Sequence, residues 1–153
     1  MAKEHSYKIT ISNNKTENEG IKYLISQDSK FIIPDLKMKK EILQHLKMKN
    51  NFIRSFDLIY LNKDNRENLV QIDLNEIILI ELKTTKKKLI NFPSGFFFGV
   101  TENELNLAEM LGSKFKFCFL SLFKGYEEYT FMTYTELNKR IRNKRIQYQV
   151  NLK

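Results

Sequence analysis

The segment from Glu76 to Thr84 constrains the fold more than any other part of the chain, because its apolar residues occupy both faces of a β-strand. These apolar residues are Ile77, Ile78, Leu79, Ile80 and Leu82. A strand that is apolar on both faces belongs in the interior of a sheet that is covered on both sides. We therefore expect this segment to be a central strand.

A capped helix and a second apolar strand follow it. Thr101-Glu102-Asn103-Glu104 has the capping-box pattern, in which the Thr101 hydroxyl accepts from the Glu104 N–H and the Glu104 carboxylate accepts from the Thr101 N–H. Gly112 predicts the end of this helix, and the segment from Phe115 to Phe123 is apolar and alternating, as in a strand. One face of the helix consists of Leu105, Ala108 and Leu111. The strand-helix-strand order predicts a parallel strand pair in a mixed sheet, and hence an α/β fold.

Upstream segments supply further elements. Apolar residues recur at helical spacing from Leu36 to Met48, which predicts an amphipathic helix. Phe56 to Leu61 predicts a strand, Asn62 to Asn68 a polar turn, and Leu69 to Ile72 a second strand. The predicted order is helix, strand, strand, strand, helix, strand, with a core at about residues 36–123 in a single domain spanning 1–153.

The remaining segments are predicted as additions to this core. They are a short strand at Tyr7–Ile11, a turn at Ser12–Glu19, a short helix at Gly20–Gln27, a short strand at Phe96–Val100, a helix at Thr135–Asn143 capped by Thr133 or Thr135, and an alternating stretch at Arg145–Leu152. The segment between residues 91 and 95 contains Pro93 and Gly95 and predicts a loop.

Composition restricts the chemistry and the compartment. Cys118 is the only cysteine, which excludes an internal disulfide and a cysteine zinc site, and its strand position predicts a buried structural thiol. His5 and His45 are the only histidines, which excludes a multi-histidine metal site. The sequence contains no phosphate-binding loop and no dinucleotide fingerprint, so we expect no nucleotide cofactor. No apolar run is long enough to span a membrane. We expect a cytoplasmic protein with no membrane partner.

Two charged residues lie within the central strand. Glu81 and Lys83 are two positions apart and project to the same face. Burying ionised groups is unfavourable unless they are paired or bind a metal. One interpretation is a site for a hard divalent cation, with Asp57 on the preceding strand as the second carboxylate. The other interpretation is an exposed ion pair at the end of a strand, which contributes only about 0 to 1 kcal/mol.

These residues and their order resemble the PD-(D/E)xK nuclease superfamily, which includes many restriction endonucleases and the archaeal Holliday-junction resolvases. The resemblance implies a restriction endonuclease-like αβββαβ core, a mixed central sheet flanked by helices. It also implies that Asp57 and Glu81 bind Mg²⁺, for which Mn²⁺ can substitute, that the Leu82 carbonyl adds a ligand, and that Lys83 positions or activates the attacking water.

Two segments carry a closer resemblance. Ile80-Glu81-Leu82-Lys83-Thr84-Thr85, together with Phe96 to Glu104, is similar to the branch that contains the C-terminal domain of the plant protein No Vein and related bacterial restriction-associated domains. The similarity covers roughly residues 56–123. Phe56 stands where the superfamily's name has Pro, and the literal Pro34-Asp35 pair lies upstream, where it predicts a turn before a helix.

Further acidic candidates come from the same resemblance. Many members of the superfamily use an acidic residue on the first helix, for which Glu41 is the first candidate and Glu19 the second. Asp73 is a rival to Asp57 as the second carboxylate, but its short separation from Glu81 in the sequence leaves little room for a hairpin that brings both carboxylates to one end.

The formal net charge of +8 is compatible with a polyanionic partner or with a merely basic surface. Lys86, Lys87 and Lys88 follow the charged strand directly, and Lys139 to Lys153 contains basic residues and no acidic one. The candidate DNA contacts in the second segment are Arg140, Arg142, Lys144 and Arg145. The alternative for both segments is that they are solvated surface with no role in DNA binding. We expect the phenylalanines to lie in the core rather than to stack on nucleic-acid bases.

The function expected from this pattern is a Mg²⁺-dependent endodeoxyribonuclease in restriction and defence, or in repair and junction resolution. Cleavage of both strands of a duplex requires two active sites, so we expect a homodimer. The alternative is a nuclease-like module that has lost activity and binds nucleic acid or a protein partner.

Overall fold

The computed structural model describes the backbone of residues 2–62 and 72–153, and the side chains from residue 15 onward within those ranges. The helices are α1 (Ala2–Gln27), α2 (Leu36–His45), α3 (Glu102–Leu111) and α4 (Tyr134–Arg140), with short 3₁₀ turns η1 (Asn50–Phe52) and η2 (Gly112–Lys114). The strands are β1 (Phe31–Ile32), β2 (Leu58–Leu61), β3 (Ile77–Thr85), β4 (Phe115–Ser121) and β5 (Glu128–Met132). The predicted strand at Leu69–Ile72 and the turn before it fall largely outside the described residues.

The strands form one mixed sheet in the order β1-β2-β3-β4-β5 among the described residues. β3 and β4 are parallel and are connected through α3, whereas the other neighbouring strands are antiparallel. The predicted α/β class, the central place of β3 and its parallel pairing with the strand after the capped helix are therefore confirmed.

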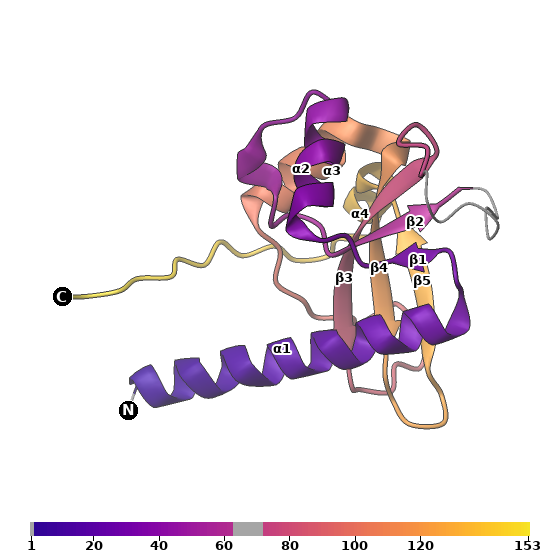
Figure 1. The fold of residues 1–153 in the computed structure, drawn as a ribbon. Helices are drawn as coiled ribbons and strands as arrows, with labels where there is room; N and C mark the ends of the chain where they lie inside the picture. The colour runs from indigo at the N-terminus through magenta and orange to yellow at the C-terminus, as the bar shows by residue number, and fades with distance from the viewer. Residues whose placement is uncertain (1, 63–71) are drawn as a thin grey trace.

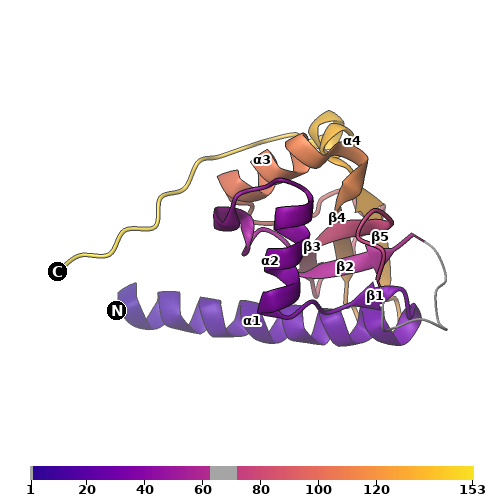
Figure 2. The ribbon, with the colours of Figure 1, turned by 45° about the horizontal axis from the view of Figure 1, so that its top comes forward.

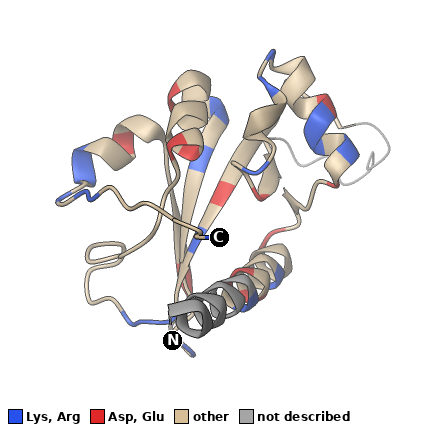
Figure 3. Ribbon diagram, turned by 90° about the vertical axis from the view of Figure 1, so that its left-hand side faces the viewer, with Lys and Arg blue, Asp and Glu red and all other residues tan. Residues whose placement is uncertain are grey.

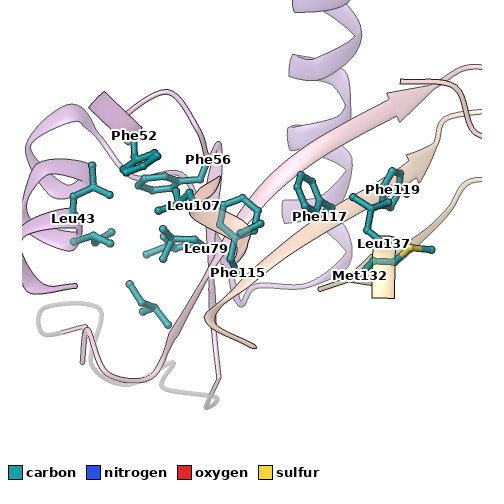
Figure 4. Close-up of a cluster of buried hydrophobic side chains, with 14 residues drawn as sticks. Leu43, Phe52, Phe56, Leu79, Leu107, Phe115, Phe117, Phe119, Met132 and Leu137 are labelled. Carbon is teal, nitrogen blue, oxygen red and sulfur yellow. The ribbon is translucent and has the colours of Figure 1, made fainter. Parts of the chain in front are cut away.

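Helices cover both faces of the sheet (Figures 1 and 2). α1 lies across one face, where Leu24 packs with Ile80 and Leu82 of β3 and with Cys118 and Leu120 of β4. The other face carries the larger core, to which α2, α3 and α4 contribute (Figure 4). This core includes Leu43, Phe52, Phe56, Leu79, Leu107, Phe115, Phe117, Phe119, Met132 and Leu137. Odd-numbered β3 residues such as Leu79 therefore face α2 to α4, and even-numbered residues face α1.

The amino-terminal segment differs from the sequence prediction. The predicted strand at Tyr7–Ile11 and turn at Ser12–Glu19 are wrong, because both belong to the continuous helix α1. The predicted short helix at Gly20–Gln27 is the last part of the same helix. The polar residues near Ser12 resemble a turn locally, but the apolar face formed by Gly20, Ile21 and Leu24 docks the helix on the sheet.

The carboxyl-terminal half also differs from the sequence prediction. Phe96–Val100 is not a strand: it is extended loop in which Phe96 and Phe98 pack edge-on against Phe119. The alternating stretch at Arg145–Leu152 belongs to no helix or strand, and it continues from α4 as an exposed tail (Figure 1). Strand β5, which pairs with β4 along its whole length, was not predicted. Thr133 caps α4 in a second capping box, as one of the two predicted options.

Gly20 allows α1 to approach the sheet closely. A Cβ atom at this position would lie 2.9 Å from Thr84 Cγ2, 3.1 Å from Leu82 Cδ2 and 3.2 Å from Leu120 Cδ2. A side chain at this position would displace all three neighbours, so glycine favours the close packing here, although it is unfavourable in the interior of a helix.

We expect the substitution Gly20→Val to destabilise the protein by about 1 to 3 kcal/mol, because the added methyl groups overpack the contact between α1 and the sheet. Chemical denaturation measures this change. Lys22→Val is the matched control, since it places the same side chain at an exposed position of α1. Equal stability of the two variants would contradict the close contact at Gly20.

Candidate metal and nucleic-acid site

The site forms where β3 continues beyond its neighbour β2. Leu58 pairs with Ile80, and from Glu81 to Thr85 β3 has strand partners only in β4. Asp57, the residue before β2, fills this place: its N–H donates to the Ile80 carbonyl at 2.8 Å, and its Oδ2 accepts from the Leu82 N–H at 2.8 Å. Because the N–H and C=O of one strand residue point to the same edge, the Leu82 carbonyl is directed to this side as well.

Glu81 is buried beside Asp57. Its side chain is 8% exposed, and its Oε1 accepts from Lys83 Nζ at 3.1 Å. Glu81 Oε2 is buried and has no hydrogen-bond partner. Within the described residues, every other buried side-chain nitrogen or oxygen has one. A buried carboxylate oxygen without a donor is unfavourable and requires a proton, a water or a cation.

Burial is the main reason that the pKa of Glu81 rises from 4.5 to about 10. The charge of the neighbouring Asp57 adds to the rise, Lys83 opposes it, and the charge of Glu104 adds a smaller contribution. The Lys83 ammonium only partly offsets the repulsion between the two neighbouring carboxylates, so ionisation of both is unfavourable. The pair is therefore poised to take up a proton or a cation.

Lys83 lies between two carboxylates. Its ammonium donates to Glu81 Oε1 at 3.1 Å and to Glu104 Oε2 at 2.8 Å, and its side chain is 10% exposed. Burial acts to lower the pKa of Lys83, but the charges of Glu81 and Glu104 outweigh it and the pKa is raised. Lys83 is thus a cation at neutral pH. The interpretation of Glu81 and Lys83 as an exposed ion pair is wrong, because both side chains are buried.

The helix α1 contributes Glu17, which the sequence analysis missed. Burial first, and then the charge of Asp57 and a hydrogen bond with its side chain, raise the pKa of Glu17 to about 7, while Lys83 and Lys39 act to lower it. Glu17 stands on the same helical face as Gly20, Ile21 and Leu24. Glu17 could have been identified from the sequence as an acidic residue on the otherwise apolar face of a helix.

The other acidic candidates lie elsewhere. Glu41 is exposed on α2, and Asp73 is exposed in the turn before β3, where its Oδ1 accepts from the Asn75 N–H. Asp73 therefore lies at the opposite end of β3 from Lys83. Glu19 is on α1, but its carboxylate forms an exposed ion pair with Lys86 at 3.3 Å. None of the three is brought to the carboxylates of Asp57 and Glu81.

No group of three or more His, Cys, Asp or Glu side chains in the described part of the chain has the arrangement of a ready metal site. The donors that could hold a cation include both side-chain carboxylates and a backbone carbonyl. They are Glu81 Oε2, the carboxylate of Asp57 and the Leu82 carbonyl, with Glu17 behind them. Oxygen donors of this kind suit Mg²⁺, which commonly binds one or two carboxylates and retains several waters.

The basic segments are exposed and lie in two places. Lys86, Lys87 and Lys88 follow β3, with Lys86 paired to Glu19 and Lys88 Nζ 4.0 Å from the centre of the Tyr126 ring. Arg140 in the last turn of α4 donates to Ser94 Oγ at 3.0 Å, and Arg142, Lys144 and Arg145 are in or near the start of the exposed tail. Figure 3 shows basic positions at the end of α4 and charges of both signs on the central strand.

Other single residues can be placed as well. Cys118 is buried in β4 as predicted, and burial raises the pKa of its thiol. Most phenylalanines pack in the cores as expected, but Phe97 is 94% exposed because its neighbours Phe96 and Phe98 turn inward to Phe119. His45 hydrogen-bonds the side chain of Asn75 on the surface.

Comparison with known proteins found no matching family model, curated protein or solved structure. Within the described residues, no helix combines the length and the apolar character needed to cross a membrane.

Proposed function

We propose that the protein is a Mg²⁺-dependent nuclease that hydrolyses phosphodiester bonds in DNA. The observation that carries this proposal is the buried Glu81 Oε2, which has no hydrogen-bond donor and lies beside a second carboxylate, Asp57. A divalent cation satisfies both groups at once, whereas a structural ion pair leaves one oxygen unsatisfied. The adjacent ammonium of Lys83 supplies a donor for a water or a phosphate oxygen.

The order of elements supports a restriction endonuclease-like core for this proposal. If α2 and η1 are treated as an insertion, α1, β1, β2, β3, α3 and β4 follow one another as αβββαβ. The first helix is then α1 rather than the predicted helix at 36–48. This assignment gives Glu17 the place of the acidic residue on the first helix, for which Glu41 and Glu19 were the candidates.

Each residue has a separate role in the proposed reaction. Asp57, Glu81 and the Leu82 carbonyl bind Mg²⁺, with Mn²⁺ as a substitute, and Glu17 adds a carboxylate near Asp57. Mg²⁺ held by these residues would polarise the scissile phosphate and lower the pKa of the attacking water. Lys83 is protonated, so it orients the water and stabilises developing negative charge but does not itself remove a proton.

The basic segments are the proposed contacts with the DNA backbone. Lys86, Lys87 and Lys88 are closest in the chain to the catalytic strand, and Arg140, Arg142, Lys144 and Arg145 form the second segment. Phosphate contacts hold the substrate without reading its sequence. A homodimer would place two such sites on a duplex, one for each strand, as cleavage of both strands requires.

The decisive test is incubation of the purified protein with plasmid, branched and single-stranded DNA in the presence of Mg²⁺, Mn²⁺ or EDTA. We expect metal-dependent cleavage that Glu81→Ala abolishes and that Lys83→Ala slows by about 10² to 10³-fold, because Lys83 stabilises the negative charge that develops in the transition state. Lys116→Ala is the matched control, since Lys116 on β4 lies on the opposite face of the sheet, near Phe131.

Identical cleavage by the wild type, Glu81→Ala and Lys83→Ala would show that the assigned residues are not catalytic. DNA binding with no cleavage under any condition would favour the alternative of an inactive module.

A further inference from the structure

The carboxylate of Glu104 contacts two donors that belong to different parts of the molecule. Glu104 Oε2 accepts from Lys83 Nζ at 2.8 Å and from the Thr101 N–H at 3.1 Å, while the Glu104 N–H donates to Thr101 Oγ1 at 3.1 Å. The capping box that begins α3 is thus joined directly to β3. The ion pair is buried, with 10% of the Lys83 side chain and 9% of the Glu104 side chain exposed.

A second capping box in the same chain shows what capping alone requires. At the start of α4, Glu136 accepts from the Thr133 N–H at 3.3 Å, and its own N–H donates to Thr133 Oγ1. Glu136 is exposed, and none of the ion pairs within the described residues involves it. Capping therefore accounts neither for the burial of Glu104 nor for its short contact with Lys83.

We propose that Glu104 is a positioning residue, which holds the Lys83 ammonium in place for the reaction. This inference rests on the proposed nuclease function. A lysine ammonium is a point charge at the end of a flexible four-carbon chain, so one acceptor leaves it several orientations. Glu81 is the other acceptor, and it also has to bind the metal. Glu104 gives Lys83 an anchor that is independent of the metal ligands.

The anchor is rigid because of where Glu104 stands. The residue occupies the third position of α3, and the hydrogen bond from the Thr101 N–H fixes its carboxylate against the start of the helix. Leu107 and Ala108 of α3 are fully buried in the core. The position of Lys83 Nζ is therefore determined by the packing of α3 as well as by β3, as expected for a preorganised site.

The test compares four variants in single-turnover cleavage at saturating protein. We expect Glu104→Ala to lower the rate constant by about 10- to 100-fold with a DNA dissociation constant within about twofold of the wild type, as for supporting residues at other metal sites. Thr101→Ala and Glu136→Ala each weaken a capping box without removing the Glu104 carboxylate, and both should stay within about threefold of the wild type. Glu104→Gln keeps an acceptor for both donors and should restore most of the rate.

A second measurement does not depend on activity. In the metal-free protein, side-chain ¹⁵N NMR should detect the Lys83 ammonium as a slowly exchanging signal that persists in Thr101→Ala and is lost in Glu104→Ala. If Glu104→Ala cleaves as fast as Thr101→Ala, or keeps the Lys83 signal, the positioning role is wrong while the nuclease function stands. If the wild type does not cleave DNA at all, the proposed function fails, and the role of Glu104 in catalysis fails with it.

Discussion

Replacement of Glu81 by Gln should abolish DNA cleavage and, in the absence of metal, make the folded protein more stable than the wild type. Cleavage should fall by more than about 100-fold, since even supporting residues of metal sites contribute 10- to 100-fold. Gln has the same shape as protonated Glu but carries no charge. Stability should rise because the variant has no carboxylate that is disfavoured by burial and repelled by Asp57.

The same substitution should change how stability depends on pH. Folding raises the pKa of Glu81 from 4.5 to about 10, so between these values the folded protein binds a proton that the unfolded chain releases. The contribution to stability is fully present below about pH 4.5 and is lost as the pH rises toward 10. Glu17, with a pKa of about 7, acts in the same direction.

Thermal unfolding in EDTA, between about pH 5 and pH 9, measures this effect. The difference in stability between Glu81→Gln and the wild type should increase with pH, and Mg²⁺ should stabilise the wild type far more than the variant, because a ligand stabilises only the state that binds it. Glu109→Gln is the matched control at an exposed position of α3. A difference that is constant with pH would contradict the raised pKa, and equal stabilisation by Mg²⁺ would contradict Glu81 as a ligand.

Replacement of Asp57 should separate its two roles. Asp57→Asn and Asp57→Ala should both lower cleavage by more than about 100-fold, since neither carries the charge that a metal ligand supplies. Only Asp57→Ala should also destabilise the fold, by about 1 to 3 kcal/mol, because it leaves the Leu82 N–H without its acceptor. Asn keeps an oxygen at the same place and can accept that hydrogen bond.

Urea denaturation of the metal-free variants, together with the cleavage assay, measures both roles of Asp57. Equal stability of Asp57→Asn and Asp57→Ala would show that the hydrogen bond to Leu82 contributes little. Cleavage by Asp57→Asn at the wild-type rate would show that the Asp57 charge is not needed, and the assignment of Asp57 as a ligand would be wrong.

The pairing of Asp57, Glu81 and Lys83 could be predicted because it depends on local rules. Alternation along a strand places Glu81 and Lys83 on one face, and the apolar residues around them place the strand in the middle of the sheet. The capping box at Thr101 was predictable for the same reason, since all its hydrogen bonds lie within four residues. Its contact with Lys83 is a tertiary interaction, and no local pattern encodes it.

The errors lie where tertiary packing overrides local pattern. The segment before Gly20 is polar enough to resemble a turn, and it becomes helix because its carboxyl-terminal part docks on β3 and β4. Phe96 and Phe98 alternate like strand residues but fill the space above Phe119. Glu17 was missed as a direct result, since a residue assigned to a turn has no helical face on which its burial could be noticed.

The shortness of β2 has a consequence for assembly of the chain with itself. A strand that runs past its neighbour exposes backbone groups that another chain can pair with, which is a common route to aggregation. Beyond Ile80, the Asp57 carboxylate accepts from the Leu82 N–H, and the buried polar side chains of Glu81 and Lys83 make the edge a poor partner for an apolar strand. The residues that form the candidate site thereby also protect the sheet from unwanted strand addition.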